Sequence, residues 1–162
     1  MQPRIHDKVG YQLIQTFQCN KLSERAQGQL HYQVWKHNDT DVLGIALSKN
    51  ESSGGFSAEL ILVEDVMQTL AILGKAQTPF HATAFKSLFI GKSVNNSSFL
   101  GAVLVDQQVI RVHPQTTRLL EIIDDYTLWP TRLKNLSVDD KQTKKRQGKQ
   151  TEEVSTDADC PK

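Results

Sequence analysis

The spacing of the apolar side chains changes at Val63, and this change limits the folds open to the chain. From Leu30 to Leu62, apolar residues recur at alternate positions in three runs, LHYQVW, VLGIALSKN and FSAELIL. Such alternation is typical of strands with one buried face. After Val63 the apolar residues recur at helical spacing. Strands followed by helices predict an α+β fold.

The segments between the three runs, HNDTD and ESSGG, consist of residues that favour turns. We therefore predict an N-terminal antiparallel β-meander of three strands, with Leu30, Tyr32 and Val34 on the apolar face of its first strand. An apolar sheet face needs a second layer to pack against it. The preceding stretch YQLIQTF, residues 11–17, fits a further strand and also a helix, and the sequence leaves the two open.

Three helices are predicted after the meander. The first covers VEDVMQTLAILG, with acidic residues in its first turn and Gly74 as its C-terminal cap. The second starts with Thr78 as N-cap and Pro79 in the first turn, and it ends before Gly91. The third covers residues 95–108, with polar caps at its start and an apolar stripe along it.

Residues 109–126 decide the architecture of the helical half. VIRV is β-branched and predicts a short strand, and HPQT predicts a turn. The following TRLLEII fits a helix capped by Thr116 or Thr117, which intrinsic propensity favours, or a strand that completes a hairpin. Residues 117–126 therefore remain open between strand and helix. With a hairpin, the order of elements is analogous to a winged-helix layout, whose third helix enters the major groove of DNA.

Composition divides the chain after Leu136. We predict a single α+β domain over residues 1–136, β-rich over 1–62 and helical over 63–136. Residues 137–162 contain no aromatic residue and no Leu, Ile or Phe, and they predict a disordered, charged tail. A basic run in this tail is a candidate arm for polyanions. It consists of Lys141, Lys144, Lys145, Arg146 and Lys149.

Charge and cysteine content exclude several classes of protein. The 162 residues include 19 Lys and Arg and 18 Asp and Glu, a formal charge of +1, so the surface as a whole does not attract polyanions. The 2 cysteines lie far apart and form no disulfide framework. No stretch resembles a signal peptide or a membrane span. We expect a cytoplasmic protein without a membrane partner.

The analogy with a winged-helix layout favours DNA as the first partner to test. Asn95, Asn96 and Ser98 at the start of the third helix carry groups that can hydrogen-bond base edges. That helix has no Lys or Arg, so phosphate contacts must come from flanking cations. The flanking cations are Lys86, Lys92, Arg111 and Arg118. The alternative function is a protein-interaction or adaptor domain that binds no nucleic acid.

The sequence gives little support for catalysis, metal binding or a cofactor. Gly91-Lys92-Ser93 lacks the earlier glycine and preceding strand of a phosphate-binding loop and predicts a turn between helices. HNDTD lacks the glutamate of a calcium loop. The histidines have no zinc-ligand spacing, and His113, the best exposed of them, has no acid or nucleophile beside it in sequence. We predict a non-catalytic protein, with an enzyme that uses His113 as a third alternative.

Trp35 follows the apolar positions of its strand by one residue, so its side chain is predicted on the outer side of the sheet with those of His31 and Gln33. An exposed aromatic side chain there can stack on unpaired bases. Packing under a loop or a terminal helix is the favoured prediction, because Trp gains a large area by burial.

Overall fold

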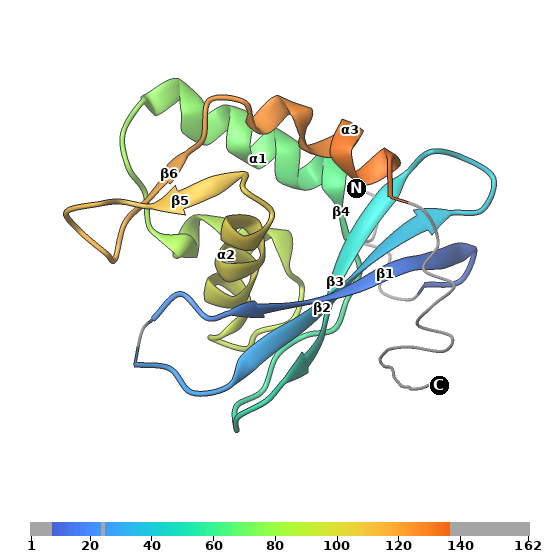
Figure 1. Ribbon diagram of the computed structural model, residues 1–162, viewed down its shortest axis with the longest axis horizontal. Coiled ribbons are helices and arrows are strands. Elements are labelled where there is room, and N and C mark those ends of the chain that lie inside the picture. The colour runs from blue at the N-terminus through green and yellow to red at the C-terminus, as the bar shows by residue number, and fades with distance from the viewer. Residues whose placement is uncertain (1–7, 24, 137–162) are drawn as a thin grey trace, which may run out of the picture.

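The computed structural model describes residues 8–23 and 25–136, and these adopt an α+β fold. Four strands form an antiparallel sheet in the order β1-β2-β3-β4, and a separate hairpin pairs β5 with β6 (Figure 1). The elements are β1 (Tyr11–Asn20), β2 (Gln29–His37), β3 (Leu43–Asn50), β4 (Ile61–Leu62), α1 (Val63–Ala76), the 3₁₀-helix η1 (Ala82–Leu88), α2 (Asn96–Asp106), β5 (Ile110–Val112), β6 (Leu120–Ile122), the 3₁₀-helix η2 (Tyr126–Leu128) and α3 (Trp129–Lys134). The predicted tail, 137–162, with its basic run lies outside the described residues.

Strands β2 and β3 confirm the predicted meander. Leu30, Tyr32 and Val34 are buried on the inner face of β2, as the alternation predicts. Residues 11–17, for which the sequence allowed a strand or a helix, lie in a strand, β1. This strand pairs along β2 and forms one edge of the sheet. The ring of Phe17 on β1 stacks on that of Tyr32 at 5.1 Å, which joins the two strands on the inner face.

The predicted third strand of the meander is largely wrong. Only Ile61 and Leu62 pair with β3, and the residues before them run outside the ladder. The backbone N–H of Ser57 is instead donated to the side chain of Asn96. Leu60, which is buried, lies against the backbone of Gly44, where an added Cβ would be 2.7 Å from the Leu60 Cδ1 atom. This segment therefore covers part of the outer face instead of extending the sheet.

Helix α1 starts at Val63, where the apolar spacing changes, but it does not end at Gly74. It continues to Ala76, and Gln77 takes the left-handed cap conformation with φ 54°. The N–H of Gln77 is donated to the carbonyl of Gly74 at 3.2 Å. Glycine is favoured but not required at such a cap, so the prediction of Gly74 as cap is wrong by one helical turn.

The second predicted helix is a 3₁₀-helix, and it starts later than expected. Thr78 and Pro79 precede it, and His81 occupies the N-cap position of η1. Phe80 is held in extended conformation because its N–H and C=O both bond to Leu120, at 2.9 and 2.7 Å. This tertiary bridge delays the helix to Ala82.

The same bridge settles the open segment 117–126. Residues Leu120–Ile122 form β6 and pair with β5, so the helix that intrinsic propensity favours is wrong. Leu120 bonds on one side to Phe80 and lies on its other side in register with Val112. Pairing on both sides outweighs a propensity difference that is below 1 kcal/mol per residue.

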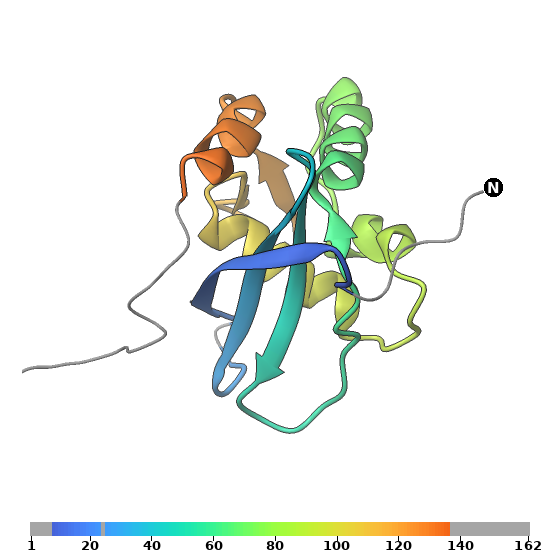
Figure 2. The same ribbon diagram turned by 90° about the vertical axis from the view of Figure 1, so that its right-hand side faces the viewer.

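The helices gather on one side of the meander. In Figure 2 β1 crosses nearest the viewer, α2 lies behind the sheet, and α1 and α3 stand at its upper end. The inner face of the sheet, α1, α2 and the hairpin β5-β6 share one core of buried apolar residues. Trp129 begins α3 and is fully buried. Among the described helices, none has the length and apolar content needed to cross a bilayer.

Candidate functional site

Helix α2, the predicted DNA-reading helix, lies inside the protein. Its residues from Asn96 to Leu104 are buried except Ser98, which is half-buried. A recognition helix must present one side to the groove of DNA. Because α2 is enclosed on nearly all sides, the winged-helix layout is not confirmed.

The amide side chains at the start of α2 hold backbone segments together. The Asn96 side chain, 3% exposed, accepts the N–H of Ser57 at 2.7 Å and donates to the carbonyl of Gly91 at 3.3 Å. The half-buried Asn95 donates to the carbonyl of Gly55 at 2.9 Å. The hydroxyl of Ser98 donates to the carbonyl of Asn95. Burial and these bonds occupy the Asn96 side chain, and base contacts by Asn95, Asn96 and Ser98 stay a prediction.

The Gly-Lys-Ser segment is a bend between η1 and α2, as predicted. The carboxylate of Glu59, 6% exposed, accepts the backbone N–H groups of Ile90 and Gly91, both at 2.9 Å. The hydroxyl of Ser57 donates to the same carboxylate. The amides of Ile90 and Gly91 at the start of this segment are thus bound to a buried carboxylate within the protein.

The predicted phosphate contacts remain on the surface but do not form a common patch with α2. Lys86, Lys92, Arg111 and Arg118 are exposed. Arg111 is paired with Glu121 across the hairpin β5-β6, with Nε and Oε1 2.7 Å apart. The contact of these four residues with DNA stays a prediction. It no longer has the support of an exposed helix between them that could read bases.

His113 has a structural partner in the β5-β6 turn. Its Nδ1 accepts the backbone N–H groups of Gln115 and Thr116, both at 3.2 Å. Within residues 8–23 and 25–136, no group of three or more His, Cys, Asp or Glu side chains is placed to hold a metal ion.

A polar network joins the sheet, α2 and α3 through Gln107. The Tyr32 hydroxyl donates to Asp106 and accepts the Gln107 side-chain amide, which in turn accepts the Trp129 indole N–H at 2.9 Å. Arg132 donates to the Gln107 carbonyl at 2.8 Å. Burial and the bond to Asp106 raise the pKa of Tyr32, so the phenol stays protonated. This network closes the core and offers no reactive group.

Cys19 lies beside this network and is also buried. Burial, with a smaller contribution from the negative charge of Asp106, raises the pKa of the Cys19 thiol to about 12. Only the thiolate is a nucleophile, so this cysteine behaves as a small apolar core residue.

An apolar groove opens where the β2-β3 turn meets α1 and α3. Figure 2 shows this turn reaching up between the two helices. The groove has a volume of about 470 Å³ and is lined by Asp41, Val42, Leu43, Val63, Glu64, Met67, Pro130 and Lys134. Leu43 and Val63 are buried and form its floor, whereas Val42 is 39% exposed. We call these eight residues the apolar groove.

Charged side chains stand at the border of the apolar groove. Asp41 and Glu64 contribute carboxylates, and Lys134 contributes an ammonium group. Asp41 forms a loose ion pair with Lys36 at 3.7 Å, and the two side chains are 79% and 43% exposed. Such exposed pairs contribute little and exchange readily.

Sequence reasoning missed this groove. The sequence predicts HNDTD as a turn and does not indicate that it lies beside two helices. The available signal was Val42, an apolar residue directly after a turn, but a single apolar residue does not reveal which elements lie beside it.

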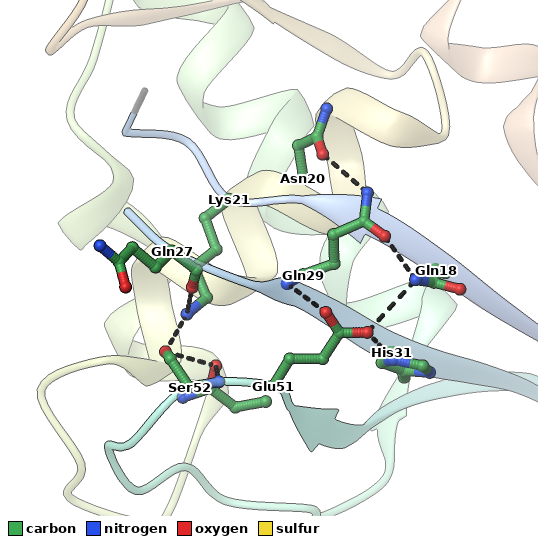
Figure 3. A network of polar contacts seen from close by, with 9 residues as sticks. Gln18, Asn20, Lys21, Gln27, Gln29, His31, Glu51 and Ser52 are labelled. Atoms are coloured by element: carbon green, nitrogen blue, oxygen red, sulfur yellow. Dashed lines mark hydrogen bonds and ion pairs between the residues drawn. The ribbon is translucent and has the colours of Figure 1, made fainter. Parts of the chain in front are cut away.

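A second polar network lies at the far end of the sheet, around Glu51 (Figure 3). Its carboxylate accepts the side chains of His31 and Gln18, at 2.8 and 3.2 Å, and the backbone N–H of Gln29 at 2.9 Å. These hydrogen bonds lower the pKa of Glu51, first that from His31 and then that from Gln29. The network ties β1, β2 and the end of β3 together on the outer face.

Trp35 is half-buried on the outer face of the sheet. The ammonium group of Lys8 lies 5.6 Å from the Trp35 ring centroid and donates to the carbonyl of Ala58 at 3.1 Å. The indole N–H donates to Gln33 at 3.2 Å. Lys8 thus covers part of the ring face that a base would need.

Comparisons of the chain with protein-family models, with curated proteins and with solved structures found no match.

Proposed function

We propose that this protein is a non-catalytic interaction domain that binds a protein partner in the apolar groove. The observation that carries the proposal is an open, mainly apolar hollow of about 470 Å³ between three structural elements. Its volume lies within the range of natural binding pockets, roughly 300–1,000 Å³. It suits one or two apolar side chains of a partner segment.

The groove combines a fixed floor with an adaptable wall. Leu43 and Val63 are 5% and 3% exposed, so the backbone below the hollow is anchored in the core. Met67 in the wall is half-buried, and its flexible thioether adapts to ligands of different shape. Val42 offers apolar area that a partner would remove from water, which is favourable.

The charges at the border define the chemistry of the partner. Among the lining residues, the carboxylates of Asp41 and Glu64 outnumber the ammonium group of Lys134. The exposed pair of Asp41 with Lys36, at 3.7 Å, is one that a cation of the partner can replace. A partner segment with an apolar residue flanked by Lys or Arg matches this pattern. Such complementarity favours the correct register over other apolar segments.

DNA binding, the first expectation from the sequence, receives less support than protein binding. The helix that would read bases is enclosed, and Arg111 is already paired with Glu121. Among the described residues, Lys86, Lys92 and Arg118 remain exposed and available for phosphate contacts, and the basic run of the tail lies outside the described part.

Peptide display against the immobilised full chain tests the proposal. We expect enriched peptides to share an apolar residue beside Lys or Arg, and a synthetic copy to bind in fluorescence polarisation. Val42→Asp should weaken this binding at least about tenfold, because a carboxylate would be desolvated in an apolar site. Ile72→Asp, at a position 67% exposed on α1 and outside the groove lining, is the matched control and should bind as the wild type does.

The same chain is titrated with a labelled DNA duplex at low and moderate salt. Salt-sensitive duplex binding without any enriched peptide would overturn the proposal in favour of the exposed cations. Equal loss of peptide binding in Val42→Asp and Ile72→Asp would also overturn it, because the binding would not depend on the groove.

A further inference from the structure

Strand β1 forms an edge of the main sheet, and its sequence lacks the usual protection of an edge. It spans ten residues, YQLIQTFQCN, without a charged residue or a proline. Within the described part of the chain, β2 is its only partner strand. Exposed edges usually carry Lys, Pro or bulges that prevent pairing with other chains. The one irregularity of β1 lies between Leu13 and Gln15, so Gln15–Asn20 is regular.

The outward backbone groups of this regular part can be identified from the register. Gln29 on β2 donates its N–H to Glu51 and accepts the N–H of Glu51, so both of its groups point away from β1. In antiparallel pairs, facing residues that do not bond to each other direct both groups outward. Asn20 faces Gln29, and Gln18 and Thr16 follow at alternate positions. These three residues therefore direct N–H and C=O toward the open edge.

Their side chains do not cover that edge. The Gln18 side-chain amide donates to the side chains of Gln29 and Glu51, and Gln29 donates to Asn20 Oδ1 at 2.8 Å. Figure 3 shows the Gln29 side chain reaching from β2 to the side chains of Gln18 and Asn20 on β1. The hydrogen bonds hold Gln18 and Asn20 over the sheet, which leaves the backbone of β1 accessible.

We propose that two copies of this chain pair antiparallel through β1, with a twofold axis at Gln18, into one continuous sheet. Gln18 then faces Gln18 of the second copy, and Thr16 faces Asn20 of the second copy on either side. Three facing pairs with two hydrogen bonds each give about six main-chain hydrogen bonds. The inference does not rest on the apolar groove.

The side chains fit a second copy of this chain. On the outer face every facing pair is polar and uncharged, so no like charges meet. On the inner face the half-buried Phe17 meets Cys19 of the second copy, which adds apolar contact on both sides of the axis. A strand that pairs with its own copy about a twofold axis closes the assembly at two chains and leaves no further β1 edge.

Sedimentation of the full chain over a range of concentrations tests the pairing. We expect a dimer for the wild type and for Gln18→Ala, which keeps the backbone N–H. Gln18→Pro should weaken the dimer at least about tenfold, because its missing N–H faces the second copy and not β2. A wild type that is monomeric at the highest soluble concentration, or a dimer that Gln18→Pro leaves intact, would overturn the proposal.

Crosslinking gives a second measurement if Gln18→Pro does not fold. With the native Cys160 replaced by serine, Gln18→Cys should form an intermolecular disulfide on mild oxidation, because facing Cα atoms lie about 5.5 Å apart. Gln12→Cys, also exposed on β1, would face no equivalent residue and serves as the control. Equal or faster crosslinking of Gln12→Cys would contradict the register and overturn the proposal.

Discussion

Replacing Asn96 by alanine distinguishes a structural residue from a surface contact. The Asn96 side chain bonds the N–H of Ser57 at 2.7 Å and the carbonyl of Gly91 at 3.3 Å, and it is 3% exposed. Asn96→Ala removes both bonds. Leaving a buried donor without a partner costs about 1–3 kcal/mol, and a typical bond to a carbonyl contributes about 0.5–1.5 kcal/mol. We therefore expect the free energy of unfolding to fall by about 1.5–4.5 kcal/mol.

Urea unfolding followed by tryptophan fluorescence measures this loss, because Trp129 is fully buried in the native protein. Asn95→Ala is the control, since the Asn95 side chain is half-buried and has one bond, to Gly55 at 2.9 Å. It should cost about 0.5–1.5 kcal/mol. A loss of less than about 0.5 kcal/mol in Asn96→Ala would refute the reasoning, because surface substitutions have effects of that size.

Three further predictions concern other parts of the fold. The pKa of Glu51 is lowered from its ordinary 4.5, so the hydrogen bonds of its carboxylate should stabilise the protein above pH 4.5 and contribute less as the pH falls through the folded pKa. The melting temperatures of Glu51→Gln and of the wild type should therefore converge in acid. Cys19, with its pKa of about 12, should not react with a thiol reagent at pH 8 in the folded protein whose other cysteine is replaced by serine, and a fast reaction would contradict its burial. Gly44→Ala should lower the free energy of unfolding by about 1–3 kcal/mol, because the added Cβ would lie 2.7 Å from the Leu60 side chain. Gly55→Ala, whose added Cβ would meet no atom of another segment within 4 Å, should be close to neutral in the same urea titration.

Local patterns predicted the parts of the fold whose partners lie nearby in the sequence. The alternation around Tyr32 identified β2 and its inner face, and the change of spacing at Val63 identified the start of α1. Both features depend on one element that presents one apolar face. The sequence pattern was sufficient there.

The errors arose where a distant segment determines the local structure. Phe80 and Leu120, forty positions apart in the sequence, bond to each other, which delays η1 and makes β6 a strand. Ser57 bonds to Asn96, so the segment before β4 leaves the sheet. Neither pairing has a signal in local propensity or periodicity. The candidate site was missed for the same reason, since the apolar groove combines residues from a turn and two separated helices.

The bonds of Gln107 have a consequence for how the chain acquires its structure during synthesis. Helix α3 has six residues, too few to be stable alone in water. Trp129 and Arg132 attach it to Gln107, whose side chain also bonds the Tyr32 hydroxyl on β2. A nascent chain that has not yet released Trp129 from the ribosome lacks the indole that fills this position. The strands are translated first, but the network around the Tyr32 hydroxyl is complete only when one of the last described segments has emerged.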